Sequence, residues 1–398
     1  MAQYFTERLE KVFHMIFTSY NQEMAQEGLR QLELIVNNQQ SPEQTKHQAL
    51  RNDMTTSLEN EIDTKEDALK IANDPESREI ADAYALLARI YAGPRFTWEE
   101  SNFPENNMRT YQCLHDSIRR CSPIGTLQAL RINGTITPTV EKDMLISFND
   151  AFRIVYNYAE QGDAFCQYII GNVFFWRDDD RISLARDMIT PPRLSLAKRI
   201  QQSLQKGSIQ ERIGALQGTV SDETLQENAT TFAKEWFNKA LNNGLAMFQG
   251  NLRNIYIDGG DFDNARRVAL TAAELGNPTM MLYTGLDCHE HGKFEDAFTW
   301  FTKGASLGQA ESTAELADYY YHFYDTKELR RLIPYNPVKA IGLYRRAATK
   351  HFSDAGYAAL QAAFGYIFHI GHLPLDWGLN ADLTHMAATK ERFMFSLP

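Results

Sequence analysis

The chain has 398 residues, and its 40 lysines and arginines against 51 aspartates and glutamates give a formal net charge of −11. Hydrophobic residues make up 43% and charged residues 23%, a balance typical of folded proteins rather than of disordered chains. Because an acidic surface repels phosphate backbones, we expect no nucleic-acid partner. The 4 cysteines form no CxxC pair, so we expect a reducing compartment rather than a disulfide framework.

The first segment of the chain has apolar residues at helical spacing, which predicts an amphipathic helix packed on the body of the protein. These residues are Phe5, Leu9, Val12, Phe13 and Ile16. Charged residues interrupt them, so the segment does not match a signal peptide, and no run reaches the roughly 18 apolar residues that span a bilayer. We therefore expect a cytoplasmic protein with no membrane partner. Specialised secretion as an effector and a helix lying on a membrane surface are the alternatives.

Residues 1–135 are expected to form an N-terminal helical region with one degenerate repeat-like hairpin. Residues 37–62 are polar and predict a loop between helices. A further helix is predicted from four residues that share one face, namely Tyr84, Leu87, Ala88 and Tyr91. Prolines break the periodicity of residues 94–110, but this stretch holds three aromatic side chains that favour burial, Phe96, Trp98 and Phe103. We therefore expect an ordered excursion there.

An internal repeat is the main signal in the sequence. The segments GDFDNA at residues 260–265 and GKFEDA at residues 292–297 match closely and lie 32 residues apart. Counting from the alanine that ends each segment, a small or apolar residue recurs eight positions later and a glycine eleven positions later. Five alanines fit this register, although His351 replaces the glycine in the last unit; they are Ala151, Ala233, Ala265, Ala297 and Ala340.

The repeat predicts pairs of helices. Its apolar positions lie on one face of a helix, and a glycine in a left-handed conformation can end that helix at Gly162, Gly244, Gly276 and Gly308. A second helix follows, with a small residue nine positions past the stop that allows close helix packing at Gly171, Gly285 and Ala317; Arg253 departs from this pattern. A hairpin cannot bury its apolar faces alone, so stacked hairpins are expected to form an α-solenoid.

These units resemble Sel-one-like repeats (SLR), which are relatives of tetratricopeptide repeats. The resemblance is carried by an alanine, an aromatic pair, a lysine-alanine pair and a glycine, found as Ala233, Trp236, Phe237, Lys239, Ala240 and Gly244. It implies an all-α protein, an α-α superhelix built as a right-handed α-solenoid of stacked helical hairpins. We expect repeats over 136–372, interrupted by an insertion at about 177–232, and a capping tail over 373–398.

The insertion and several polar clusters are the candidates for chemistry. We expect Asp178-Asp179-Asp180 to form a solvated turn or cap, and residues 194–216 to form one helix. The run from Asp287 to His291 contains metal-ligand residue types, but adjacent residues on a helix point about 100° apart, so a helix-end cluster before Gly292 is favoured over a metal site. The histidines His369, His372 and His385 lack a fixed acidic partner, and Cys166 and Cys288 are expected to be small buried residues.

We therefore expect no catalytic residues, no metal and no cofactor, and a non-catalytic scaffold or adaptor that binds a peptide or protein. Two alternatives stay open. One is a metal-dependent or hydrolytic enzyme with its site in the 177–232 insertion or the C-terminal tail. The other is a peptide-sensing regulator in which a ligand rotates one repeat against another.

The resemblance to tetratricopeptide repeats also implies where a partner binds. In such hairpins, side chains beside the tightly packed small residue face the inner surface. The residues at these positions are Tyr168, Asn172, Trp176, His289, Glu290, Asp318, Tyr321 and His322. Aromatic rings supply contact area at little entropic cost, and the polar groups can fix a peptide backbone. The acidic balance favours a neutral or basic partner, and the oligomeric state is left open.

Overall fold

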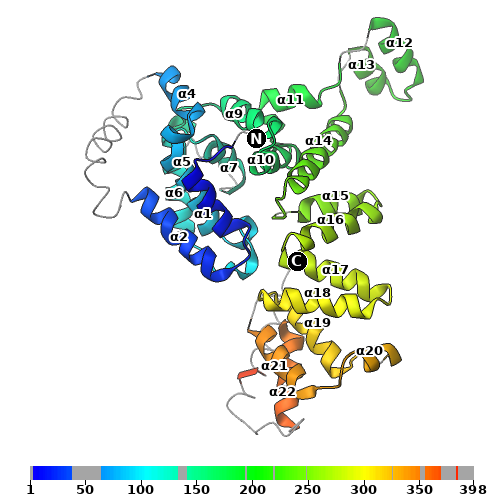
Figure 1. The fold of residues 1–398 in the computed structure, drawn as a ribbon. Helices are drawn as coiled ribbons and strands as arrows, with labels where there is room; N and C mark the ends of the chain where they lie inside the picture. The colour runs from blue at the N-terminus through cyan, green and yellow to red at the C-terminus, as the bar shows by residue number, and fades with distance from the viewer. Residues whose placement is uncertain are drawn as a thin grey trace. The chain divides into compact units, whose positions relative to one another are not determined.

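All regular elements in the described part of the chain are helices, which confirms the all-α prediction (Figure 1). The computed structural model describes residues 3–37, 64–132, 141–192, 195–217, 220–247, 249–324, 326–349, 355–368 and 382–383. These residues divide into two compact units. Unit 1 holds Met1–Ser19 and Glu23–Gly260, and unit 2 holds Tyr20–Gln22 and Asp261–Pro398. The boundaries expected near residues 135 and 372 stay predictions.

The N-terminal amphipathic helix is present as α1 (Glu7–Phe17). Thr6 caps it by accepting a hydrogen bond from the backbone N–H of Leu9 at 3.2 Å. The five apolar residues that predicted this helix are all buried. The helix α2 (Gln22–Val36) follows. The Trp98 indole donates to the carbonyl of Ile16 at 2.8 Å, so the proline-containing stretch packs on α1.

The remaining helices of the N-terminal region also lie in unit 1. Trp98 and Phe103 are buried in the proline-containing stretch and Phe96 is half-buried, so the expected ordered excursion is confirmed. In chain order the elements are α4 (Lys65–Asn73), α5 (Pro75–Tyr91), the short 3₁₀ helices η1 (Pro94–Phe96) and η2 (Glu99–Ser101), α6 (Asn107–Arg119) and α7 (Pro123–Ile132).

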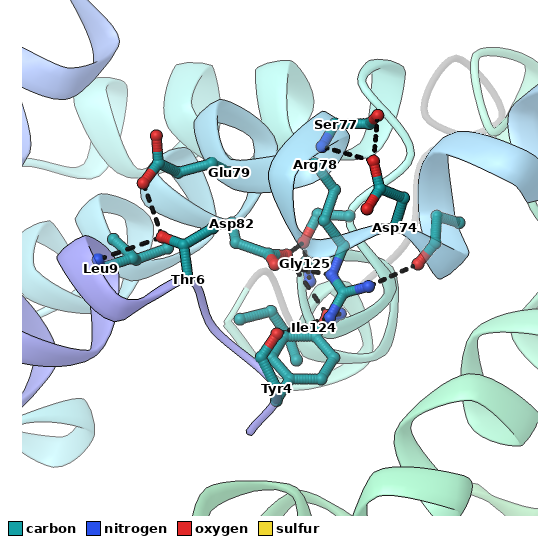
Figure 2. A network of polar contacts seen from close by, with 12 residues as sticks. Tyr4, Thr6, Leu9, Asp74, Ser77, Arg78, Glu79, Asp82, Ile124 and Gly125 are labelled. Carbon is teal, nitrogen blue, oxygen red and sulfur yellow. Dashed lines mark hydrogen bonds and ion pairs between the residues drawn. The ribbon is translucent and has the colours of Figure 1, made fainter. Parts of the chain in front are cut away.

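A buried ion pair joins the N-terminal segment to α5 and α7 (Figure 2). The Nε of Arg78 donates to the Asp82 carboxylate at 3.0 Å, and both side chains are excluded from solvent. The guanidinium also donates to the carbonyl of Tyr4 at 2.6 Å and to that of Ala72 at 2.9 Å. The hydroxyl of Ser122 donates to Asp82 at 2.6 Å. Most polar groups of the pair are thus satisfied, which is the condition under which a buried pair is tolerated.

Glu10 on α1 makes the stability of unit 1 depend on pH. Burial, reinforced by the nearby carboxylate of Asp163, raises the pKa of Glu10 to about 7, whereas an unfolded glutamate titrates near pH 4.3. The folded state therefore binds the extra proton between these values, and stability falls as the pH rises through this window. We expect Glu10→Gln to raise the free energy of unfolding at pH 8 by about 1–2 kcal/mol, discounted for partial exposure, and to change it little at pH 4.

Urea unfolding curves at the two pH values measure this effect. The control is Glu7→Gln on the same helix, because Glu7 is exposed and its pKa is lowered by Lys11. Equal stability of the Glu10→Gln variant and the parent at pH 8 would contradict the assignment.

The first repeat hairpin is formed by α9 (Phe148–Glu160) and α10 (Ala164–Phe175), which lie in unit 1.

The insertion contains two helices where the sequence predicted one over residues 194–216. That prediction is wrong in this respect, because the extended backbone of Lys206 divides the segment in two. The insertion comprises η3 (Asp178–Asp180), α11 (Ser183–Ile189), α12 (Leu196–Gln205), α13 (Ile209–Gln217) and the first part of α14 (Asp222–Asn242), which is followed by α15 (Gly250–Asp258).

Unit 2 continues the hairpins with a core of alanines and aromatic rings. Each long helix packs against the next one in the chain, as a stacked array requires. Its helices are α16 (Phe262–Glu274), α17 (Pro278–Glu290), α18 (Phe294–Ser306), α19 (Ala310–Tyr321), α20 (Lys327–Leu332), α21 (Pro337–Ala348) and α22 (Ala355–Ile367). None of the helices in the described ranges has the length and apolar character needed to cross a bilayer.

The glycines act as the repeat predicts. The four that were expected to end helices have φ values of 99°, 90°, 102° and 93°, at Gly162, Gly244, Gly276 and Gly308. The small residues of the second helices allow close packing. A Cβ atom on Gly171 would lie 2.6 Å from the ring of Phe237, and one on Gly285 would lie 2.5 Å from the ring of Phe301. Stacked helical hairpins are therefore confirmed on both units.

Candidate functional site: a pocket of unit 1

A pocket of about 590 Å³ lies among α5, η1, α7, α10, η3 and α15, all within unit 1. Its size is typical of sites that hold a small ligand or a few peptide side chains. The lining combines aromatic, aliphatic, amide and charged groups: Arg89, Arg95, Phe96, Leu127, Gln128, Arg131, Tyr168, Ile169, Asn172, Val173, Trp176, Asp178, Gly250 and Asn251.

One face of α10 supplies three predicted partner-binding residues, Tyr168, Asn172 and Trp176. They follow one another at intervals of four residues, so they share a helix face. Asp163 fixes the start of this helix by accepting a hydrogen bond from the Cys166 N–H at 2.8 Å. Tyr168 and Asn172 are buried in the wall, whereas Trp176 is 50% exposed at its rim. The structure thus brings these three residues to one pocket; their binding role stays a prediction.

An ion pair between Arg131 of α7 and Asp178 of η3 lies at one side of the pocket. Arg131 also lies over the ring of Trp176, with its Cζ atom 5.6 Å from the ring centroid. Burial raises the pKa of Asp178 to about 7, although the neighbouring Arg131 favours its ionised form. Arg131 and Asp178 thereby connect α7 and η3 to the exposed tryptophan.

The expectation of a solvated turn at Asp178-Asp179-Asp180 is wrong for two of the three residues. Asp178 and Asp179 are buried, and only Asp180 is exposed. The Asp179 carboxylate accepts from Arg177 at 2.9 Å and from Arg186 at 2.6 Å. Arg177 and Arg186 thus compensate the buried charge of Asp179. Arg131 does the same for Asp178. Residue spacing alone does not reveal these pairs.

Gln128 of α7 is the least satisfied polar group of the pocket. Its side chain is 3% exposed, and neither its amide nitrogen nor its oxygen has a hydrogen-bond partner among the described residues. Leaving a buried polar group unsatisfied costs about 1–3 kcal/mol. The Nε of Arg131 also lacks a partner there. Arg95, on η1, is exposed and makes no ion pair with a described residue.

The other predicted partner-binding residues lie in unit 2, where most of them take part in internal contacts. The ring of His289 shares a hydrogen bond with the Tyr319 hydroxyl at 2.7 Å, and burial lowers its pKa. His322 lies in a left-handed conformation at the end of α19, and its Nε2 is 2.8 Å from the carbonyl of Ile333. Glu290 is exposed and Tyr321 is half-buried.

Asp318 is buried, whereas it was expected to lie on the inner surface, where a partner could reach it. It is 6% exposed, and it accepts hydrogen bonds from the hydroxyls of Tyr344 and Tyr357. The carboxylate therefore ties α19 to α21 and α22 inside unit 2. The reason is that α21 and α22 each supply one tyrosine hydroxyl donor, Tyr344 and Tyr357, which the repeat pattern does not encode.

The described histidine, acidic and cysteine side chains that are candidates for metal binding or nucleophilic chemistry lie in surroundings that do not favour either. The described residues contain no group of three or more histidine, cysteine, aspartate or glutamate side chains placed to hold a metal ion. The Asp287–His291 run ends α17 before Gly292, as expected. His369, His372 and His385 lie outside the described residues. Burial raises the pKa of Cys113 to about 11 and that of Cys121 to about 12, and it also raises the pKa of Cys166 and Cys288, which disfavours their thiolates at neutral pH.

Sequence reasoning missed the part of the pocket that comes from α5, η1 and α7. Arg95, Gln128 and Arg131 belong to segments outside the repeat template, and only tertiary packing brings them to α10. One signal could have drawn attention to α7: Gln128 is a polar residue within the apolar run of residues 123–130.

No family model and no curated protein sequence matches the chain. Several solved structures are similar to it, including two repeat proteins. A Sel1 repeat protein from Oxalobacter formigenes is 15% identical, with 100% of this chain and 96% of that chain covered and a TM-score of 0.42. A protective antigen of uropathogenic Escherichia coli strains, which displays an SLR fold, is 14% identical, with coverages of 81% and 79% and a TM-score of 0.27.

Both TM-scores are below 0.5, so the assignment to a class rests on the hairpins of this chain. The helix-ending glycines and the close helix contacts at Gly171 and Gly285 are the features that the SLR-like pattern predicts. The chain is an all-α protein built of stacked helical hairpins, and its repeat pattern resembles that of Sel-one-like repeats.

Proposed function

We propose that this chain is a non-catalytic adaptor that binds a peptide or a protein segment in the pocket of unit 1. The observation that carries the proposal is the convergence of Tyr168, Asn172 and Trp176 on a cavity of about 590 Å³. The repeat resemblance implies a partner surface at these residues, and the cavity they line is a separate feature of the folded chain.

The expected mechanism is surface complementarity. Trp176 is half exposed and offers a ring face to a partner, while the buried Tyr168 forms the wall behind it. Arg131 lies near the tryptophan ring and holds Asp178, so the rim is ordered before a partner arrives. A preordered site loses less conformational entropy on binding, and a tryptophan in such a position is the residue type that most often dominates binding energy.

Binding by the intact chain can be tested without knowing the natural partner. The probe is a display library of random twelve-residue peptides selected on the immobilised full-length protein, and affinities of selected peptides are then measured by fluorescence anisotropy. We expect Trp176→Ala to weaken binding at least about tenfold, because hot-spot truncation costs about 2 kcal/mol or more.

The control is Phe262→Ala, which truncates another exposed aromatic side chain, located on α16 of unit 2. It should bind the selected peptides like the parent, and both variants should keep the parent's helical circular dichroism spectrum. Failure to enrich any peptide, or full binding by a folded Trp176→Ala variant, would refute the proposed site.

A further inference from the structure

The pocket of unit 1 contains more hydrogen-bond donors than acceptors. Arg95 is exposed to solvent and has no ion pair with a described residue. Arg131 commits one terminal nitrogen to Asp178, and its Nε has no partner. A guanidinium carries five N–H donors and no acceptor, so most of this donor capacity is not used by Asp178.

Gln128 adds an independent observation on the same wall. Its buried amide lacks both a donor for its oxygen and an acceptor for its NH₂ group among the described residues. A ligand that satisfies both atoms must offer an acceptor and a donor close together. A peptide meets this condition, since it carries a side-chain oxygen and a backbone N–H, whereas a fully deprotonated inorganic anion such as sulfate offers only acceptors.

We propose that the pocket selects an acidic peptide segment and places an aspartate or glutamate carboxylate of that segment among Arg95, Gln128 and Arg131. This inference rests on the proposed function and specifies the chemistry of its partner. The carboxylate accepts from the guanidinium groups and from the Gln128 amide, and the aromatic rings of Phe96 and Trp176 contact the neighbouring residues of the peptide. Hydrogen bonds between guanidinium and carboxylate are among the stronger ones in proteins.

The proposal reverses the expectation of a neutral or basic partner, which was based on the net charge of −11. At physiological ionic strength, charges separated by more than about 8 Å are largely screened from each other. The groups lining the pocket therefore decide which ligand charge is favoured inside it. A lysine or arginine side chain placed there would meet the cationic groups of Arg95 and Arg131.

The experiment uses the peptides selected on the full-length protein and examines their composition and their affinities. We expect enrichment of aspartate and glutamate over the starting library. We expect a selected peptide to lose at least about tenfold in affinity when its carboxylates are replaced by amides, Asp→Asn and Glu→Gln. Arg95→Gln should weaken binding by about threefold or more, whereas Arg331→Gln, at an exposed position of unit 2, should bind like the parent.

The outcomes separate this inference from the proposed function. A neutral or basic consensus that still requires Trp176 would overturn the acidic preference and leave the pocket as the binding site. Equal binding of the acidic peptide and its amide counterpart would overturn it in the same way. If binding is independent of Trp176, the proposed site itself is wrong, and the inference falls with it.

Discussion

Replacing Arg78 by alanine is expected to lower the free energy of unfolding by about 3–5 kcal/mol, because the variant leaves the carboxylate of Asp82 buried without its cationic partner. Burial already raises the pKa of Asp82 to about 6 with the arginine present. The folded state of the variant must either carry an uncompensated charge or bind a proton, so the loss should be larger at pH 8 than at pH 5. Urea unfolding of the intact chain, followed by circular dichroism, measures it.

Two further variants show whether the charge is the cause. Arg78→Met combined with Asp82→Leu removes both charges and should be less destabilised than Arg78→Ala alone, because no unpaired ion stays buried. Lys11→Ala removes the exposed ion pair with Glu7 and should leave the urea midpoint close to that of the parent. If Arg78→Ala unfolds at the same urea concentration as the parent, the buried ion pair does not contribute the stability expected of it.

The second large effect concerns the close contact between α17 and α18. Gly285→Ala places a methyl group 2.5 Å from the ring of Phe301, which is fully buried and has little room to move. Overpacking of this kind typically costs about 1–3 kcal/mol. Because alanine favours helix by about 1 kcal/mol over glycine, we expect a net destabilisation of up to about 2 kcal/mol, measured from the urea unfolding of the intact chain.

The matched control is Gly342→Ala on α21. Gly342 also lies within a helix of unit 2, but a Cβ atom there would meet no atom within 4 Å. The same substitution should therefore stabilise the protein by about 0.5–1 kcal/mol through helix propensity alone. If both variants change stability in the same direction and by the same amount, close packing against Phe301 is not the reason for a glycine at position 285.

The sequence was sufficient to predict the hairpins because their determinants are local. A glycine such as Gly276 or Gly308 ends a helix through its own backbone conformation, and an apolar stripe indicates which face of that helix is buried. Gly171 and Gly285 are likewise predictable, since each lies at a fixed distance from the preceding stop. These features recur in every regular unit, so repetition strengthens the prediction.

The pocket was predictable only in part, for a physical reason. Tyr168, Asn172 and Trp176 follow from the periodicity of a single helix. Arg95 and Gln128 lie about forty to eighty residues earlier in the chain, and their proximity to α10 depends on how helices outside the repeat pack. The same applies to the buried Asp178, whose neutralising arginine lies on α7.

Photo-crosslinking from the rim of the pocket tests the central claim most directly. The full-length protein would carry p-benzoylphenylalanine in place of Trp176, or in place of Phe262 as the control, and would be irradiated with a peptide selected on the parent. We predict that the peptide is joined to the chain labelled at position 176 and not to the chain labelled at position 262. Crosslinking only from position 262, by two folded variants, would contradict the assignment of the partner to the pocket of unit 1.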